Sequence, residues 1–166
     1  MKVEGLMRFA ILEDLTPEES DTILRRCEAI NVKKGEKVIA AGESADALFL
    51  VRSGRIEVRF PVMYLNALVE VPMDVIGEGD VCGWSVLVPP HTYTLTAYAT
   101  QDSELIKIKR TDLQDCCEAN MRLGYIVMKN ITRILGRRYE IARQGLIRGV
   151  QKDLEKKDNK TLWRAD

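Results

Sequence analysis

The chain has 166 residues, which is enough for one domain with a buried core. Its 25 basic and 25 acidic residues cancel to a formal net charge of zero, so no overall field draws it toward nucleic acid or an anionic membrane. The longest apolar runs fall far short of a membrane span and the start does not read as a signal peptide, so we expect a cytoplasmic protein with no membrane contact.

Four cysteines are present, at Cys27, Cys82, Cys116 and Cys117, and no two of them form a CxxC pair. A reducing cytoplasm fits this pattern, and we expect four free thiols. A metal site on Cys116, Cys117 and His91 would lack any recognised ligand spacing, so we expect no metal and no cofactor.

The first predicted element is a helix that begins at Thr16, after a short apolar piece at residues 9–15. Thr16 suits the cap position, Pro17 suits the first helical position, and Glu19 stands three residues after the cap, as a capping box requires. The apolar spacing predicts a buried stripe made of Ile23, Leu24 and Cys27. We expect this helix to be structural.

From Asn31 onward the apolar period changes to two, which indicates β-strands. Glycines at 35, 42 and 54 mark the turns between the first strands. The apolar residues at alternate positions are Val32, Val38, Ala40, Leu48, Leu50, Ile56, Val58 and Phe60. Further strands are predicted over residues 63–72, 75–76, 92–99 and 104–108. About eight short strands are typical of a jelly roll, so the predicted fold is mainly β, with the roll at about residues 31–110.

The stretch from Gly77 to Ala99 lies at the centre of this organisation. Three glycines, at 77, 79 and 83, lead into the short apolar run WSVLV, and Pro89-Pro90 ends it. We expect a single helical turn between two strands. The N–H groups at the start of such a turn can bind an anion, so a pocket is one interpretation, and ordinary glycine turns in a compact β-fold are the other.

After Thr111 the apolar spacing becomes helical. A short helix is predicted to begin at Thr111, Asn120 is predicted to break it, and a long helix is predicted from Met121 to about Leu146. Two apolar lines run along the long helix: Val127, Ile131, Ile134 and Ile141, and beside them Met128, Leu135, Ala142 and Leu146, with Tyr139 at the edge.

The two lines together cover roughly 160° of the helix surface, which is wider than packing on a sheet alone requires. The extra width fits either more contact with the chain's own roll or a second copy of the same helix. The heptad-like spacing of the second line favours a homodimer. Residues 147–166 are mostly charged, and we expect this tail to fray.

The stretch KKGEKVIAAGESADALFLVRSGRIEV, residues 33–58, resembles the opening of the cyclic nucleotide-binding domains of the catabolite-activator (Crp/Fnr-type) superfamily. The landmark positions are Gly35, Gly42, Glu43 and Gly54. GEGDVCGWSVL and YTLTAYATQDSELIKI resemble the phosphate-binding cassette and the closing strands of that family. The resemblance covers residues 9–146, and it implies an eight-stranded double-stranded β-helix, or jelly roll, between short N-terminal helices and a long C-terminal helix.

The cassette departs from the family pattern at two positions. The family has Phe-Gly-Glu, whose Glu takes the ribose 2′-hydroxyl, and Cys82-Gly83-Trp84 falls there. The family then has an Arg that pairs with the cyclic phosphate, followed by Ala, Ser or Thr, and Tyr93 followed by Thr94 stands there. The resemblance therefore implies a degenerate cassette without its two charged contacts. The candidate pocket residues are Gly83, Trp84, Ser85, Val86, Tyr93 and Thr94.

Three interpretations of this pocket stay open. In the first, the roll is retained for structure and binds nothing. In the second, the pocket takes a less anionic, nucleotide-like or aromatic ligand stacked on Trp84 and Tyr93. In the third, weak binding of cyclic nucleotides persists.

We expect a non-enzymatic ligand-sensing or regulatory module. The chain has one histidine, Ser85 lacks the second glycine of a G-x-S-x-G elbow, and no P-loop, dinucleotide or zinc motif is present. Family members that regulate transcription carry a winged helix-turn-helix, and the twenty residues after Leu146 show none, so we expect no specific DNA binding. The alternative is a structural module with an empty pocket whose long helix or tail binds another protein.

Overall fold

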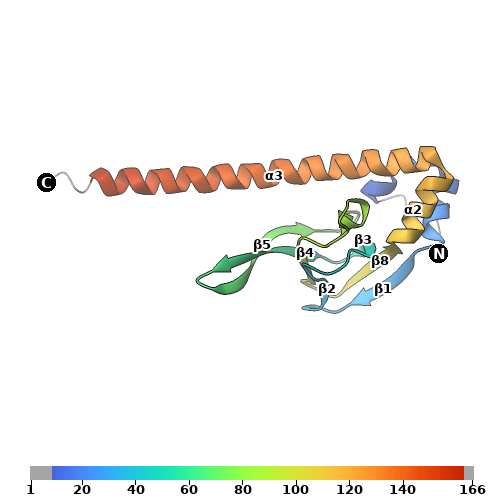
Figure 1. The fold of residues 1–166 in the computed structure, drawn as a ribbon, viewed down its shortest axis with the longest axis horizontal. Coiled ribbons are helices and arrows are strands. Elements are labelled where there is room, and N and C mark those ends of the chain that lie inside the picture. Colours follow the sequence, from blue (N-terminus) through green and yellow to red (C-terminus); the bar gives the residue numbers. More distant parts are fainter. Residues whose placement is uncertain (1–8, 163–166) are drawn as a thin grey trace. The chain divides into compact units, whose positions relative to one another are not determined.

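The structure is a computed structural model that describes residues 9–162 (Figure 1). It consists of two compact units, of which the first runs to Ile131 and the second begins at Thr132. The first unit contains the sheets, the short helices and the start of the long helix, and the second contains the rest of that helix.

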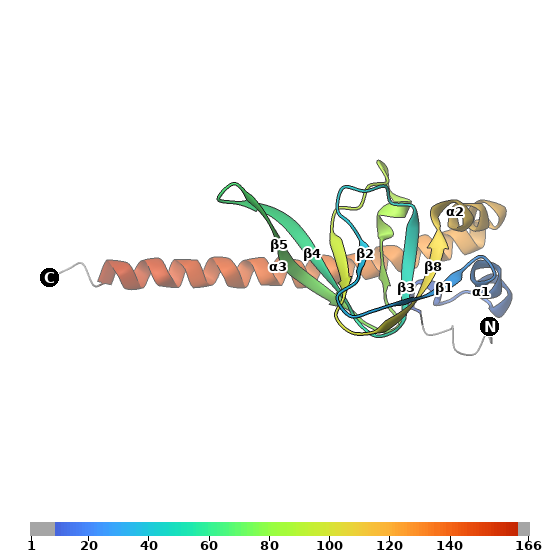
Figure 2. The same ribbon diagram turned by 90° about the horizontal axis from the view of Figure 1, so that it is seen from below.

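Within the described residues, eight strands form two four-stranded antiparallel sheets (Figures 1 and 2). One sheet has the order β1-β8-β3-β6 and the other has the order β2-β7-β4-β5. The chain crosses repeatedly between the two sheets, as in a jelly roll, so the predicted mainly β roll is confirmed. The strands are β1 Glu28–Val32, β2 Lys37–Ile39, β3 Ala47–Ser53, β4 Ile56–Tyr64, β5 Ala67–Ile76, β6 Val81–Cys82, β7 Thr96–Ala99 and β8 Ser103–Lys109.

The chain enters the roll through a 3-10 turn, η2 (Ala10–Leu12), and the helix α1 (Pro17–Leu24). The predicted capping box is confirmed: the Glu19 N–H donates to Thr16 Oγ1 at 3.2 Å and the Thr16 N–H donates to Glu19 Oε2 at 2.9 Å. Of the predicted stripe, Ile23 and Leu24 are buried, whereas Cys27 is half-buried because it follows the end of the helix.

Two strand positions differ from the predicted alternation. Ile39 is buried in place of Val38, because β2 has an irregular register against β7 between Lys37 and Ile39. Phe60 is exposed because β4 pairs with β7 only from Ile56 to Arg59, so the strand leaves the core before it reaches Phe60.

The segment predicted as one strand over residues 63–72 contains a hairpin turn instead. β4 runs to Tyr64, and Leu65 and Asn66, with φ of 47° and 61°, connect it to β5. Two central residues with positive φ are what a tight two-residue hairpin requires. β5 then continues without a break through the gap predicted between residues 72 and 75.

The strand predicted over residues 92–99 is shorter, since β7 begins at Thr96. The backbone of Tyr93 pairs with a turn, because its N–H donates to the carbonyl oxygen of Glu43 at 2.9 Å and its carbonyl oxygen accepts from Gly42 at 2.8 Å. The loop before β7 is therefore held against the turn that follows β2.

Two helices follow β8, namely α2 (Arg110–Ala119) and α3 (Met121–Leu162). Asn120 separates them as predicted, and its Oδ1 accepts from the Leu123 N–H at 3.1 Å. The predicted end of the long helix near Leu146 is wrong. Gly145 and Gly149 weaken a helix by only about 1 kcal/mol each, and no proline follows, so the charged tail continues as helix to Leu162. The last four residues of that tail lie outside the described residues.

The first turns of α3 belong to the core of the first unit. Val127 and Ile131, from the first predicted line, are buried there, together with Leu123. Asn130 is fully buried, and its Nδ2 donates to the carbonyl oxygens of Ile11 at 3.0 Å and Glu13 at 2.7 Å. This side chain ties the start of the long helix to the N-terminal segment.

Candidate functional site

The predicted cassette lies between β6 and β7. After β6 comes the 3-10 turn η3 (Trp84–Leu87), so the single helical turn expected from the sequence is present. Gly83 stands at the cap with φ of 83°, and a Cβ at this position would lie 2.9 Å from the carbonyl oxygen of Ala47. Both the backbone conformation and the close approach of β3 therefore require glycine here.

Tyr93 points inward from the loop that precedes β7. It is 8% exposed, and its hydroxyl donates to the carbonyl oxygen of Ala47 at 2.6 Å and accepts from the N–H of Ala47 at 3.2 Å. Burial raises the pKa of the Tyr93 phenol above its ordinary value, so the group is neutral. Both hydrogen-bonding functions of the hydroxyl are thus used within the fold.

The remaining predicted site residues lie in different environments. Ser85 and Val86 are buried, Trp84 is half-buried, and Thr94 is exposed. The structure brings Gly83 and Tyr93 together, because a Cβ at Gly83 would lie 3.4 Å from Tyr93 Cε1.

The loop between η3 and Tyr93 is held mainly by its backbone. The peptide bond between Pro89 and Pro90 is cis, and His91 has φ of 56°. The His91 N–H donates to Val88 at 2.9 Å, and the His91 carbonyl oxygen accepts from Ala45 at 2.7 Å. These bonds fix the path of the loop next to the start of β3.

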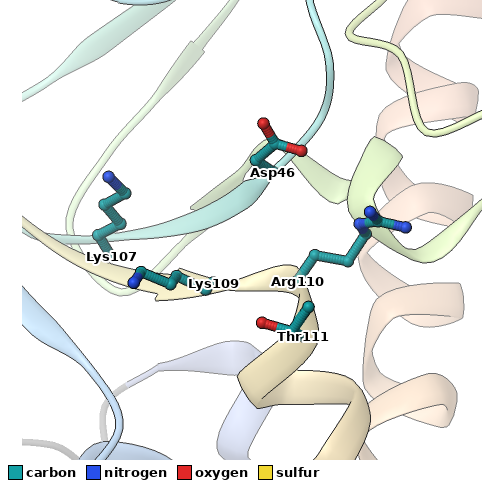
Figure 3. Close-up of a pocket in the computed structure, with 5 residues that line it drawn as sticks. All are labelled: Asp46, Lys107, Lys109, Arg110 and Thr111. Carbon is teal, nitrogen blue, oxygen red and sulfur yellow. The ribbon is translucent and has the colours of Figure 1, made fainter.

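A separate cavity of about 240 Å³ lies where β8 ends and α2 begins (Figure 3). It is lined by Asp46, Lys107, Lys109, Arg110 and Thr111, so it contains none of the predicted site residues. Figure 3 shows the two lysine side chains on one side of the site and the Arg110 side chain directed to the other. The run KIKRT at the end of the last strand was the sequence signal for this basic cluster, and the sequence reasoning missed it.

Among residues 9–162, no group of three histidine, cysteine, aspartate or glutamate side chains is placed to hold a metal ion. All four cysteines lie in the described part and are free thiols. Burial raises the pKa of the Cys27 thiol to about 12. No helix in the described part is long and apolar enough to cross a membrane.

Comparison with known proteins shows which family the chain belongs to. The family model described as "Cyclic nucleotide-binding domain" matches residues 29–120, which is more than half of the chain. The chain is 28% identical over 128 residues to the cyclic AMP receptor protein of Thermus thermophilus, covering 77% of this chain and 56% of that protein. It thus spans little more than half the length of this relative.

Solved structures have the same fold. A cyclic nucleotide-binding protein from Geobacter metallireducens superposes with a TM-score of 0.71 at 24% identity, covering 84% of this chain and 98% of the other. The regulatory subunit of a cAMP-independent protein kinase A from Trypanosoma brucei superposes with a TM-score of 0.71 at 18% identity, covering 87% of this chain and 50% of the other. The chain belongs to the cyclic nucleotide-binding domain family, in the form found in catabolite activator proteins.

Proposed function

We propose that the chain is a non-enzymatic regulatory module, in a reducing cytoplasm, whose cassette does not bind cAMP or cGMP in the manner of its family. The observation that carries this proposal is the inward position of Tyr93. The resemblance places Tyr93 where the family has the arginine that pairs with the cyclic phosphate. Here the side chain is buried, and its hydroxyl is bonded to both backbone groups of Ala47.

The energy of the missing contacts supports the proposal. An arginine gives a phosphate two charge-assisted hydrogen bonds, and removing one such partner from a buried charge costs about 2 to 5 kcal/mol. Losing the carboxylate at Trp84, a partner for the ribose hydroxyl, costs roughly 1 to 3 kcal/mol more. A combined loss of about 3 to 8 kcal/mol turns a micromolar site into a millimolar site or a weaker one.

The environment of Tyr93 adds a further penalty. Its hydroxyl can reach a ligand only by leaving Ala47, and the two backbone groups of Ala47 would then be unpaired in the core. A stacked aromatic ligand would also need the Tyr93 ring, which is buried against Gly83, so Trp84 is the better candidate surface for such a ligand. The regulatory subunit described as cAMP-independent has the same fold, so the fold alone does not imply binding of cAMP.

Calorimetry with cAMP and cGMP tests the proposal. The wild type should release no heat at micromolar ligand, and the double variant Trp84→Glu with Tyr93→Arg should move toward binding because it restores both charges. The matched control is Trp84→Gln with Tyr93→Gln, which changes the same positions without adding charge. Micromolar binding by the wild type refutes the proposal. If the variant Trp84→Glu with Tyr93→Arg also releases no heat, and the control variant is folded, the backbone of the cassette differs from that of the family as well.

We further propose that the module is a homodimer formed through α3. Tyr139 and Leu146 are 68% and 70% exposed, and Ala142 lies between them on the same side of the helix. At 100° per residue these three fall within a band of roughly 60°, which suits a self-paired helix. Leu146→Lys should halve the mass measured by light scattering, and Ile141→Lys, on another side of the helix, should leave it unchanged.

The second candidate function is an interaction module whose pocket binds nothing. The exposed apolar side chains of α3 favour it, because they offer a surface to another protein whether or not the cassette is open. Thermal shifts separate the two functions, since a ligand sensor is stabilised by its ligand and an interaction module only by its partner. For either function we propose no sequence-specific binding of DNA, because the net charge is zero and the bulk attraction to phosphate is therefore weak.

A further inference from the structure

The cavity at the junction between β8 and α2 has more positive than negative charge. Its volume is about 240 Å³, and it is lined by two lysines, one arginine, one threonine and one aspartate (Figure 3). These residues are Lys107, Lys109, Arg110, Thr111 and Asp46. Three cations and one carboxylate leave the lining with a net charge of +2, although the chain as a whole has a net charge of zero.

None of the three cations is neutralised by a neighbour in the described part of the chain. The side chains of Lys107, Lys109 and Arg110 make no ion pair and no hydrogen bond with residues 9–162. Glu28 stands opposite Lys107 in the strand register but forms no ion pair with it, so Lys107 is the most screened of the three. The charges of the other two side chains are available to a ligand.

Arg110 has one donor that is buried without an acceptor. Its Nε atom is shielded from solvent and has no hydrogen-bond partner. Leaving a buried donor unpaired lowers stability, so such atoms in folded proteins usually have an acceptor. The backbone N–H of Arg110 donates to the carbonyl oxygen of Asp46 at 2.8 Å, which fixes the residue at the wall of the cavity. The side chain of Arg110 therefore has hydrogen-bonding capacity that the fold does not use.

The start of α2 adds donors to the same cavity. Lys109 stands at the cap position of this ten-residue helix and makes no capping hydrogen bond, because an ammonium group cannot accept one. The first N–H groups of a helix have no acceptor within the helix, and they favour a negative charge. Thr111, in the first turn, lines the cavity with an exposed side chain whose hydroxyl is a further donor.

We propose that this cavity binds a phosphate group, either inorganic phosphate or the phosphate of a small phosphorylated molecule. A phosphate dianion matches the net charge of the lining, whereas a carboxylate would neutralise only half of it. The guanidinium of Arg110 can give paired hydrogen bonds to phosphate oxygens, and the lysines act as point charges. The cavity is smaller than the roughly 300 to 1,000 Å³ of pockets for drug-sized ligands, so it suits a phosphate-sized group. The site is separate from the cassette and does not depend on the proposed function.

The acidic residues around the cavity favour a small anion over a macromolecule. An extended polyanion such as nucleic acid needs a continuous track of basic residues, but the neighbours on β1 and α2 include Glu28 and Asp112. The carboxylate of Asp46, which accepts from Ser44 Oγ at 2.7 Å, lies at the cavity itself and repels an anion. Asp46 therefore weakens the binding of phosphate, and its replacement has an expected direction that differs from that of the cations.

Titration of the full chain with inorganic phosphate, followed by ¹H–¹⁵N spectra, tests the site. The amide signals of Asp46 and of residues 107–112 should shift and saturate at millimolar phosphate, and sodium acetate at the same ionic strength should not reproduce these shifts. Glycerol 3-phosphate distinguishes the two sources of the phosphate group. Tighter binding of this ester than of inorganic phosphate identifies a phosphorylated small molecule as the ligand, and weaker binding identifies the free ion.

Substitutions of both signs complete the test. Lys109→Gln and Arg110→Gln should each raise the phosphate dissociation constant by about five- to tenfold, because each removes a charge-assisted contact. Asp46→Asn should lower the dissociation constant by roughly threefold, because it removes a repulsion. Lys34→Gln is the matched control: it removes the same charge near the other end of β8 and should change the dissociation constant by less than about twofold.

The exposed positions keep the test independent of folding. Lys109 and Asp46 are exposed, so their variants report on the site even if Arg110→Gln is destabilised in thermal melting. Three results overturn the inference: shifts that do not saturate, shifts that acetate reproduces, and a dissociation constant that stays the same in Lys109→Gln and Asp46→Asn.

Discussion

Replacing Tyr93 with phenylalanine keeps the ring and removes the hydroxyl that joins the cassette loop to β3. The hydroxyl makes two hydrogen bonds to Ala47, one as donor at 2.6 Å and one as acceptor at 3.2 Å. Ala47 is itself buried, so in the variant its N–H and carbonyl oxygen both lose a partner inside the core.

The expected loss of stability follows from these two bonds. A buried polar group left without a partner costs about 1 to 3 kcal/mol, so the loss of a partner by both Ala47 groups should lower the free energy of unfolding by about 2 to 6 kcal/mol. For a chain of this size the melting temperature should fall by on the order of 10 °C. The Ala47 amide should also exchange its hydrogen faster with solvent, because the bond that protects it is gone.

Urea denaturation and hydrogen exchange measure both effects. Tyr98→Phe is the matched control, because Tyr98 lies beneath the cations of Lys37 and Arg59, at 5.6 Å and 4.8 Å from its ring centroid, and phenylalanine keeps that ring. The control should change stability by less than about 0.5 kcal/mol. If Tyr93→Phe is as stable as the control, the hydroxyl is not anchored in the core and the argument against a phosphate contact fails.

Three further predictions concern the rest of the fold. The pKa of Glu19 lies below its usual 4.5, chiefly because the Arg122 side chain donates a hydrogen bond to it. The contribution of Glu19 to stability is therefore complete above pH 4.5 and is lost as the pH falls through the folded pKa. In Glu19→Gln, the free energy of unfolding measured with urea should fall less steeply as the pH is lowered through this range. Gly54→Ala should lower the free energy of unfolding by about 2 to 5 kcal/mol, because the new Cβ would lie 2.0 Å from Ser103 Oγ and the residue has a φ of 95°. Gly136→Ala, whose new Cβ would have nothing within 4 Å, should raise the free energy of unfolding by about 0.5 to 1 kcal/mol. Equal effects of the two substitutions would contradict this. Cys27, whose pKa is about 12, should react with iodoacetamide at pH 8 much more slowly than a free model thiol, and comparable rates would contradict the assigned burial.

Signals confined to a few neighbouring residues predicted the local structure well. The capping box needs only Thr16 and Glu19, and the break at Asn120 is marked by a helix-breaking residue between two helical patterns. The strands of the roll were predicted because glycine turns separate segments of period two, and the resemblance supplied how those strands connect.

Exposure was harder to predict than periodicity. Phe60 and Val58 alternate with polar residues in the same way, but Val58 is buried and Phe60 is exposed. The difference arises because β7 stops pairing with β4 at Arg59, and the length of a neighbouring strand is not visible in the pattern of β4 itself. The alternation therefore showed which side each residue faces but not whether that side is covered.

In the candidate site, contacts between residues that are far apart in the sequence were also not predictable. The resemblance places Tyr93 at the position of the family arginine, but the partner that holds the tyrosine inward, Ala47, is 46 residues away. The cavity at the start of α2 likewise joins Asp46 to residues at the end of β8 and the start of α2. Such pairs depend on how two segments meet in the fold, and one sequence without that geometry does not specify them.

Asn130 restricts how the start of the long helix can move. Its amide is bonded to two carbonyl oxygens of the N-terminal segment, so it sets both the rotation and the axial position of α3 at that point. Advancing the helix by one residue would move this side chain by about 1.5 Å and turn it by roughly 100°, which breaks both bonds. Any sliding or rotation of the start of α3 along the N-terminal segment therefore requires that both of these buried bonds break.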